Sequence, residues 1–367
     1  MVNKINKDNK EKEKVYVIGN GWGSYYFTKN LNKNKYEPII IAPNLQVLNT
    51  PKLTNLLSDS NAKVEFQNPH GKIIQDSIQD IDIDNKNLIT SSGNIIPYKY
   101  VVLSIGSETN DFGIDGVNTH TYKFKTISDA ITIREKLSCL NNVNKQIYII
   151  GSGITGIEIA SKIKNISNNS NIKIIEGLDS IMQGTNDKTK NDIWQNLTNT
   201  NIQFNTCTMV KSINNNNINV LKTKTNLIEN LKFDNINDII IWTGGVKFNG
   251  YGKSKLYHTL NKIVLIKPRG IDVYDNFSIG QNYPIYCIGD MVANKGPPTA
   301  QNAKIQGEWL AKYFNSNFNE NFLQSNNFES KSKGKIIHLS TGTYMESNYY
   351  SGYIPKFLDK IIEWINL

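Results

Sequence analysis

Two glycine-rich segments constrain the fold of this chain more than any other feature. They are "VYVIGNGWGS" at residues 15–24 and "IYIIGSGITGIEIA" at residues 147–160. Each follows an apolar run and precedes a segment with helical spacing. In such strand–turn–helix units the first glycine permits the bend, the second lets the backbone approach a pyrophosphate, and the third lets helix and strand pack closely. Two of these turns predict a protein that holds two dinucleotides.

The apolar segments around the turns follow the same order twice. A strand, a helix and a second strand are predicted at 14–19, 24–33 and 37–43, and again at 145–151, 154–165 and 171–177. Residues 94–106 and 237–245 predict a returning strand for each set. A strand at 282–290 and a helix at 299–314 then resume the first set. We therefore predict an α/β fold with two Rossmann-like dinucleotide-binding domains, the second inserted in the first.

The second glycine turn has the pattern of an NADH site. Gly151, Gly153 and Gly156 supply all three glycines, and Glu176 closes the next strand 20 residues after Gly156. A carboxylate at this spacing accepts hydrogen bonds from an adenosine ribose, and it repels a ribose 2′-phosphate. The site is therefore predicted to prefer NADH to NADPH.

The first glycine turn predicts a different ligand. Gly19, Gly21 and Gly23 precede Ser24 at the third pattern position, and the second strand ends in "IIIAPN" without an acid. FAD is the natural candidate where another site already takes NADH. The predicted organisation is a disordered arm at 1–13, an FAD-binding domain at 14–125 and 276–330, an NADH-binding domain at 126–275, and a C-terminal extension at 331–367.

The extension ends in "PKFLDKIIEWINL" at 355–367, which predicts an amphipathic helix because its apolar residues fall mostly on one helical side. Three interpretations of this apolar side remain open. It packs on the protein body, it forms a homodimer contact, or it makes a peripheral contact with a membrane.

Composition narrows the classes of protein. Three cysteines far apart and four histidines argue against a disulfide framework and a metal site, and Cys287 is expected to be a small core residue. The net charge of +9 is spread as single lysines, which indicates a basic surface with no nucleic-acid partner. The N-terminal residues lack the pattern of a signal or transit peptide, and no run approaches the roughly 18 to 20 apolar residues of a membrane span. We expect an intracellular protein, cytoplasmic or peripheral on a membrane.

Six motifs together resemble one known family. They are "IGNGWGS", "NTP", "FGIDGV", "GSGITGIE", "YCIGD" and "GPPTAQNAKIQG", in order between about residues 14 and 314. The chain is similar to the type II NADH:quinone oxidoreductases, single-subunit NADH dehydrogenases that do not pump protons. The resemblance implies hydride transfer from NADH to FAD, followed by electron transfer to a quinone. Oxygen, a small oxidant or a ferredoxin-type protein remain alternative acceptors.

The resemblance also implies site residues, by motif. At FAD it places Gly19, Gly21, Trp22, Gly23, Thr50, Gly289, Asp290, Thr299 and Ala300. At NADH it places Gly151, Gly153, Thr155, Gly156, Glu176, Gly244 and Gly245. Thr50 and the residues from Thr299 to Gln301 would lie at the flavin ring, and Asp290 at the ribityl chain. Glu158 and Gln301 are the implied catalytic residues.

Other interpretations of these residues stay open. Asp290 is also suited to cap the following helix, and Glu158, expected in the first turn of a helix, gains from the helix dipole in any case. Gln301 is also read as an ordinary exposed helix residue, and Lys304 and Gln306 are expected in solvent.

Two positions depart from the family pattern. Ile305 stands where the family has a quinone-site glutamine, and Asn44 stands where it usually has arginine. These departures keep open a second function, that of an FAD- and NADH-binding redox sensor or scaffold with slow turnover, akin to apoptosis-inducing flavoproteins.

Overall fold

The computed structural model describes residues 11–139, 145–330, 336–340, 342–345 and 348–351. Its contacts divide the chain into two compact units. Unit 1 contains residues 11–49, 65–108 and 247–330, and unit 2 contains 50–64, 109–246 and the described part of 336–351. The amphipathic helix predicted after residue 355 lies outside the described residues.

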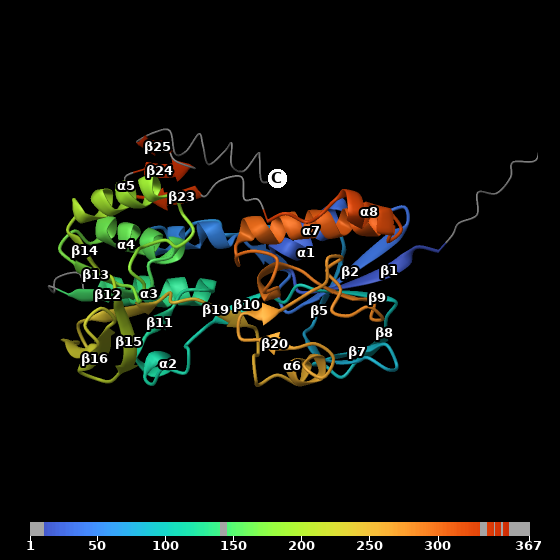
Figure 1. Ribbon diagram of the computed structural model, residues 1–367, viewed down its shortest axis with the longest axis horizontal. Helices are drawn as coiled ribbons and strands as arrows, with labels where there is room; N and C mark the ends of the chain where they lie inside the picture. Colours follow the sequence, from blue (N-terminus) through green and yellow to red (C-terminus); the bar gives the residue numbers. More distant parts are fainter. Residues whose placement is uncertain (1–10, 140–144, 331–335, 341, 346–347, 352–367) are drawn as a thin grey trace, which may run out of the picture. The chain divides into compact units, whose positions relative to one another are not determined.

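Unit 1 is built on a parallel sheet of five strands in the order β22-β9-β1-β2-β5 (Figure 1). The strands are β1 (Glu13–Ile18), β2 (Tyr36–Ala42), β5 (Lys72–Gln75), β9 (Tyr100–Leu103) and β22 (Ile285–Cys287). Their apolar runs are nearly continuous because both faces are covered, and Val15 and Val17 of the central strand are fully buried. Cys287 is buried in the same core, as predicted.

Helices and smaller sheets cover the sheet of unit 1. The helices α1 (Trp22–Asn30) and α7 (Ala300–Asn315) pack against each other, and α6 (Lys255–Leu260) packs on β6. The remaining elements are β3 (Gln46–Leu48), β4 (Glu65–Gln67), β6 (Ile78–Asp82), β7 (Asn87–Thr90), β8 (Ile95–Pro97), β20 (Ile266–Lys267), β21 (Gly270–Ile271), the 3₁₀ helix η2 (Gly289–Met291) and α8 (Glu320–Ser325).

Unit 2 repeats this design in the order β11-β18-β12-β13-β14, again all parallel. The strands are β11 (Tyr122–Lys123), β12 (Gln146–Ile150), β13 (Asn171–Ile175), β14 (Ile202–Asn205) and β18 (Ile239–Trp242). The other elements are the 3₁₀ helix η1 (Thr50–Leu57), α2 (Val117–His120), α3 (Ile127–Cys139), α4 (Ile154–Ile166), α5 (Asp187–Thr198), and an antiparallel sheet of β15 (Thr208–Ile213), β16 (Asn217–Lys222) and β17 (Leu227–Lys232).

The two main sheets share the same local hydrogen bonds. Gly19 N donates to Ile41 O at 2.9 Å, and Gly151 N donates to Ile175 O at 2.8 Å. The predicted returning strands are confirmed, since β9 pairs with β1, β18 pairs with β12, and β22 completes the first sheet. The predicted pair of Rossmann-like folds is therefore confirmed.

The boundaries between the two observed units differ from the predicted domain boundaries. The chain crosses at residues 108/109 and 246/247, where β10 (Ser107–Thr109) pairs with β19 (Val246–Phe248). The predicted boundaries lie at 125/126 and 275/276. The physical reason is burial, because Phe248, Leu256 and Leu260 belong to the hydrophobic core of unit 1.

The described part of the extension is a sheet, which the sequence did not suggest. It contains β23 (Ile336–Leu339), β24 (Gly342–Met345) and β25 (Asn348–Ser351), all antiparallel. Strand β23 packs on α4.

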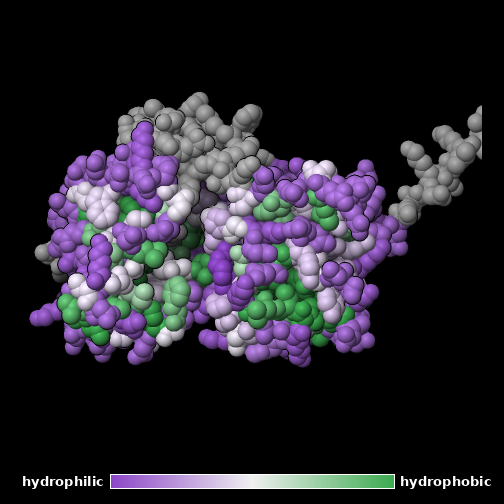
Figure 2. Space-filling model, in the orientation of Figure 1, coloured by the Kyte–Doolittle hydropathy of each residue, from purple (hydrophilic) through white to green (hydrophobic). Residues whose placement is uncertain are grey.

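Hydrophilic side chains cover most of the visible face of each unit, with smaller apolar areas among them (Figure 2). None of the described helices has the length and apolarity needed to cross a bilayer.

Candidate dinucleotide sites

The first glycine turn, residues 19–24, joins β1 to α1. Gly19 has φ +103°, and a Cβ there would lie 2.3 Å from Ser104 O, so only glycine fits. Around Gly21 a Cβ would meet nothing within 4 Å. Gly21 is also the N-cap of α1, which has no side-chain cap and no acid in its first turn. This helix N-terminus therefore offers backbone N–H donors and a positive dipole to an anion.

The second glycine turn, residues 151–156, reproduces this geometry between β12 and α4. Gly151 also has φ +103°, with Thr243 O 2.7 Å from the position of a Cβ. Gly153 is open in the same sense and caps α4 without a side-chain hydrogen bond. A Cβ on Gly156 would lie 2.1 Å from Gly151 O, so this position serves helix packing. Both turns fit a diphosphate at the middle glycine.

The Glu176 carboxylate is held beside the second turn. Its Oε2 accepts hydrogen bonds from Ser152 N at 2.9 Å and Ser152 Oγ at 2.6 Å, and its Oε1 accepts one from Leu178 N at 3.0 Å. Three donors fix the carboxylate at the carboxyl end of β13. This is where a dinucleotide ribose lies in a Rossmann-like fold.

In unit 1 the side chain that bonds to the segment after β2 is an amide of the glycine turn itself. Asn20 Nδ2 donates to Asn44 O at 3.3 Å and to Leu45 O at 3.1 Å. Asn68 Nδ2 in turn donates to Asn20 Oδ1 at 3.1 Å. The two turns therefore differ in charge, since the first presents neutral amides where the second presents an acid.

The returning strand of unit 2 brings two further predicted residues to the second turn. Gly244 follows β18, and its Cα lies 3.1 Å from the position of a Cβ on Gly151. A Cβ on Gly245 would lie 3.5 Å from the Phe112 ring. Thr155 is the second residue of α4. These residues share one edge of the unit 2 sheet.

Glu158 lies elsewhere on α4 than predicted. The expectation that it sits in the first helical turn is wrong, because α4 begins at Ile154 and its first turn carries no acid. Its side chain is buried, and Oε1 accepts a hydrogen bond from His338 N of β23 at 2.9 Å. Burial raises the pKa of this carboxyl group to about 8. Its catalytic role stays a prediction.

Asp290 lies in η2, directly after β22. Its Oδ2 accepts a hydrogen bond from Ser107 Oγ at 3.0 Å. The alternative that Asp290 caps the following helix is wrong, since the N-cap of α7 is Thr299, whose Oγ1 accepts from Asn302 N at 3.2 Å. Ala300 and Gln301 follow as the first two residues of α7.

Gln306 is the clearest error of the sequence prediction. It was expected in solvent, yet it is fully buried. Its Oε1 accepts from Gly289 N at 2.6 Å, and its Nε2 donates to Lys295 O at 3.1 Å. The signal was present, because Gln306 falls between Ala303 and Leu310 on the buried side of α7. Lys304 is also only partly exposed, with Nζ 4.8 Å from the centroid of the Tyr26 ring.

Trp22 and Thr50 take positions that the motifs did not specify. The Trp22 indole packs on Tyr26 and Phe66, and its Nε1 donates to Leu48 O at 3.2 Å. A Cβ on Gly23 would lie 2.9 Å from Ser104 Oγ. Thr50 is the first residue of η1 and is exposed.

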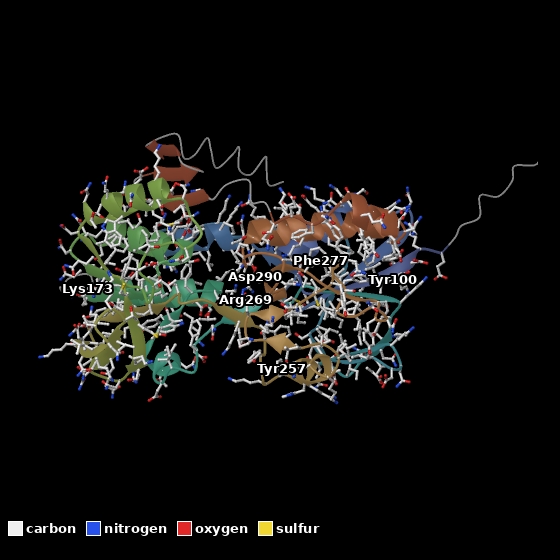
Figure 3. The ribbon with its side chains drawn as sticks, in the orientation of Figure 1. Tyr100, Lys173, Tyr257, Arg269, Phe277 and Asp290 are labelled. Carbon is white, nitrogen blue, oxygen red and sulfur yellow. The ribbon has the colours of Figure 1, made fainter. Side chains whose placement is uncertain are left out.

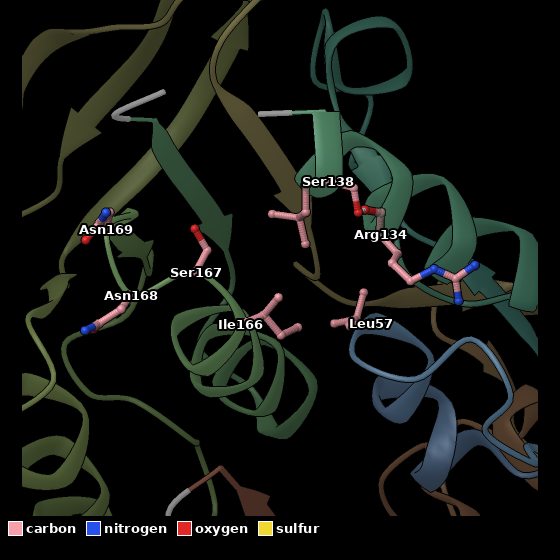
Figure 4. Close-up of a pocket in the computed structure, with 8 residues that line it drawn as sticks. Leu57, Arg134, Ser138, Ile166, Ser167, Asn168 and Asn169 are labelled. Carbon is pink, nitrogen blue, oxygen red and sulfur yellow. Dashed lines mark hydrogen bonds between the residues drawn. The ribbon is translucent and has the colours of Figure 1, made fainter. Parts of the chain in front are cut away.

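Unit 2 also has a surface pocket of about 320 Å³ (Figure 4). Arg134 and Ser138 of α3 lie on one side of it, and Ser167 and Asn168 lie after the end of α4. This is the opposite end of α4 from the glycine turn, so the pocket is separate from the dinucleotide site. Among the described residues no group of three His, Cys, Asp or Glu side chains is placed to hold a metal ion.

Comparison with known proteins finds matches over most of the chain. The sequence profile of the family described as "Pyridine nucleotide-disulphide oxidoreductase" matches residues 13–307. A Dictyostelium discoideum protein named "Probable NADH dehydrogenase" is 28% identical over 356 residues, which covers 83% of this chain and 74% of that protein. The "External alternative NADH-ubiquinone oxidoreductase, mitochondrial" of Yarrowia lipolytica is 26% identical over 83% of this chain, which spans only 59% of that protein.

Solved structures share the fold. NDH2 from Plasmodium falciparum in complex with NADH superposes with a TM-score of 0.80 at 20% identity, covering 97% of this chain and 95% of that one. The sulfide:quinone oxidoreductase of Aquifex aeolicus gives 0.77 at 15% identity, covering 96% and 91%. At these identities the likeness describes the fold alone.

Proposed function

Because the chain belongs to the pyridine nucleotide-disulphide oxidoreductase family, we propose that it is an FAD-dependent NADH dehydrogenase of the type II, non-proton-pumping class. It oxidises NADH and passes the electrons to a quinone. The names of the relatives support this activity, since those from Dictyostelium and Yarrowia are called NADH dehydrogenase and NADH-ubiquinone oxidoreductase. When bound, FAD accepts a hydride from NADH and releases two electrons to the acceptor.

The observation that carries the proposal is the duplicated turn. Each unit offers a middle glycine with open space around it at the N-terminus of an uncapped helix. Of the two turns as the structure describes them, the second has an orienting carboxylate beside it, that of Glu176, and the first is bonded by amides. This difference supports FAD at the first turn and NADH at the second.

The residues proposed for FAD come from unit 1, apart from Thr50. They are Gly19, Gly21, Trp22, Gly23, Gly289, Asp290, Thr299 and Ala300, with Gln301 next to the reacting ring. The residues proposed for NADH come from unit 2. They are Gly151, Gly153, Thr155, Gly156, Glu176, Gly244 and Gly245. Glu158 keeps its proposed catalytic assignment, although the contact described above is with β23.

Cysteine chemistry does not compete with this assignment. Some flavoproteins with this fold reduce disulfides through a cysteine pair. Here the three cysteines are all free, Cys207 and Cys287 are buried, and burial raises the pKa of the Cys287 thiol. An acceptor that diffuses to the flavin is therefore required, and a quinone fits that requirement.

A spectroscopic titration tests the activity. The purified chain should be yellow, and NADH added without oxygen should bleach the flavin absorbance. A soluble quinone should then restore it rapidly. Ile305 favours the second candidate, the sensor or scaffold. For that function we expect a reduced flavin that persists in the presence of quinone. A colourless chain that takes up no FAD excludes both functions.

For location, the proposal is a peripheral enzyme that meets its quinone at a membrane surface through the predicted helix after residue 355. Flotation with anionic vesicles tests this, comparing the full chain with a chain truncated after residue 355. A truncated chain that floats equally well contradicts the proposal. A truncated chain that instead changes from dimer to monomer assigns the helix to a homodimer.

A further inference from the structure

Arg269 holds together two segments of the loop that carries the predicted flavin contacts. The side chain extends from the β20–β21 hairpin of unit 1. Its Nη1 donates to Asp290 O at 2.9 Å, and its Nη2 donates to Gly296 O at 3.4 Å. Figure 3 shows Arg269 and Asp290 side by side. One guanidinium group thus spans the loop from η2 to the residues before α7.

The hairpin itself is pressed against this loop. A Cβ on Gly270 would lie 2.2 Å from Met291 O, so the backbone approaches η2 as closely as a glycine permits. Strand β21 also bridges to the loop, with Ala293 N donating to Ile271 O at 2.8 Å. The two residues that follow Arg269 are therefore held directly against this loop.

The use of arginine at this position is informative. The chain has 41 basic residues, and only Arg134 and Arg269 are arginine. A lysine supplies a single point charge, whereas the planar guanidinium directs several N–H groups at fixed angles to separate acceptors. Two carbonyl oxygens on different segments match that geometry.

The other side of the loop is held by α7. Gln306 joins Gly289 N and Lys295 O, and Asn302 Nδ2 donates to Lys295 O at 2.8 Å and Pro297 O at 3.0 Å. These side chains are neutral. Arg269 is therefore the group among these three that brings a full positive charge to the loop. Its guanidinium is partly buried, and burial lowers its pKa while Asp290 opposes that change.

We propose that Arg269 is a positioning residue for the flavin, which fixes the loop of residues 289–296 and supplies the positive charge that raises the reduction potential of the bound ring. The inference rests on the proposed binding of FAD to unit 1. A fixed positive charge in a partly dehydrated site favours the reduced, more negative form of a flavin. None of the six family motifs quoted from the sequence contains Arg269.

The test compares three variants of the full chain. Arg269→Gln removes both the positive charge and the paired N–H donors of the guanidinium group. Arg269→Lys keeps the charge but loses the paired donors. Lys267→Gln removes a charge from the same hairpin. Lys267 is an exposed residue that pairs with Asp272, so it is a matched control for charge on this hairpin. For each variant we measure the Kd of FAD from flavin fluorescence and the reduction potential of the bound flavin by spectroelectrochemistry. Circular dichroism reports on folding.

The expected results separate positioning from folding. Arg269→Gln should weaken FAD binding by about tenfold or more, as for loss of a charge-assisted hydrogen bond, and lower the potential. Arg269→Lys should also weaken binding but keep a potential near that of the wild type. Lys267→Gln should change neither quantity.

Other results overturn the inference. A folded Arg269→Gln variant with the Kd and potential of the wild type contradicts it, as does a Lys267→Gln variant with the same shifts. If Arg269→Gln does not fold, Arg269→Lys decides, and wild-type FAD affinity in that variant is the contradicting result. A wild-type chain that binds no FAD overturns the proposed function as well, so the two failures are distinguishable.

Discussion

At the scale of single residues, Glu176 is predicted to determine which nicotinamide dinucleotide the second turn accepts. Its carboxylate is held in place by hydrogen bonds from Ser152 N, Ser152 Oγ and Leu178 N. We expect Glu176→Ala to weaken NADH binding by about 10- to 100-fold, the range for lost hydrogen bonds to a charged group. The loss for NADPH should be smaller, because the same change removes repulsion of the 2′-phosphate.

Steady-state kinetics with NADH and with NADPH tests this prediction. The informative quantity is the ratio of kcat/KM for NADH to kcat/KM for NADPH, which should fall in Glu176→Ala. Asp187→Ala is the control, since Asp187 is an exposed acid on α5 of the same unit. An unchanged ratio in Glu176→Ala would mean that another group selects the cofactor.

We expect the buried Glu158 carboxyl group to make the stability of the folded protein depend on pH. Burial raises its pKa from 4.5 to about 8, so the folded protein keeps a proton that the unfolded chain releases. The contribution of the protonated Glu158 carboxyl group to the stability of the folded protein is therefore complete below a pH of about 4.5. This contribution is lost as the pH rises through about 8. The hydrogen bond from His338 N and the charge of Lys162 both lower the pKa, but burial has the larger effect.

Glu158→Gln isolates this effect, because the amide stays neutral at every pH and can still accept from His338 N. Thermal unfolding is measured at about pH 5 and about pH 8.5, on either side of most of this transition. The Tm of the wild type should fall more between the two conditions than the Tm of the variant. Equal falls would show that Glu158 titrates normally.

At the scale of elements, the β12–turn–α4 unit separates a binding glycine from a packing glycine. Gly153→Ala places a methyl group in open space with φ near −66°, which alanine adopts freely. We expect it to keep the wild-type Tm and to weaken NADH binding by about tenfold or more, or about 1.4 kcal/mol. Gly156→Ala places a methyl group 2.1 Å from Gly151 O and should cost about 1–3 kcal/mol of stability.

Each glycine variant is the control for the other. Both add a single methyl group to the same helix N-terminus, and calorimetry with NADH titration reads stability and affinity separately. If Gly153→Ala unfolds and Gly156→Ala does not, the assignment of the two positions is reversed.

Elements of this kind are the part of the structure that sequence patterns predict well. The glycine spacing and the apolar runs are local, and they predicted β1, α1, β12 and α4 together with both returning strands. The spacing of Gln306 on α7 indicates that it is buried, but the hydrogen-bond partners of Gln306 and Arg269 could not be predicted in this way. Their partners are backbone groups of η2 and of the loop before α7, and pairing with them becomes visible only after β22 and α7 have packed into unit 1.

At the scale of the whole molecule, the same limit applies to domain boundaries. Residues 247–275 follow the last strand of unit 2 and were therefore assigned to it. Their apolar side chains, including Phe248 and Leu260, are instead buried in unit 1. A boundary depends on where a segment buries its surface, and strand order along the sequence does not record this.

The duplicated design leads to a prediction about the complete chain. The two glycine turns consist of separate residues, so a substitution that disables one turn should leave ligand binding at the other intact. We expect Gly21→Ala to lose flavin but keep NADH affinity within about twofold, and Gly153→Ala to keep flavin but lose NADH affinity. Gly21→Ala should not turn over with quinone, and Gly153→Ala should do so slowly at an NADH concentration well below its weakened Kd. At that NADH concentration an equimolar mixture should be no more active than Gly153→Ala alone, because under the proposed function the flavin and its reductant are held by the same chain. Recovery of a quarter or more of the wild-type rate in the mixture would show that cofactors meet between chains.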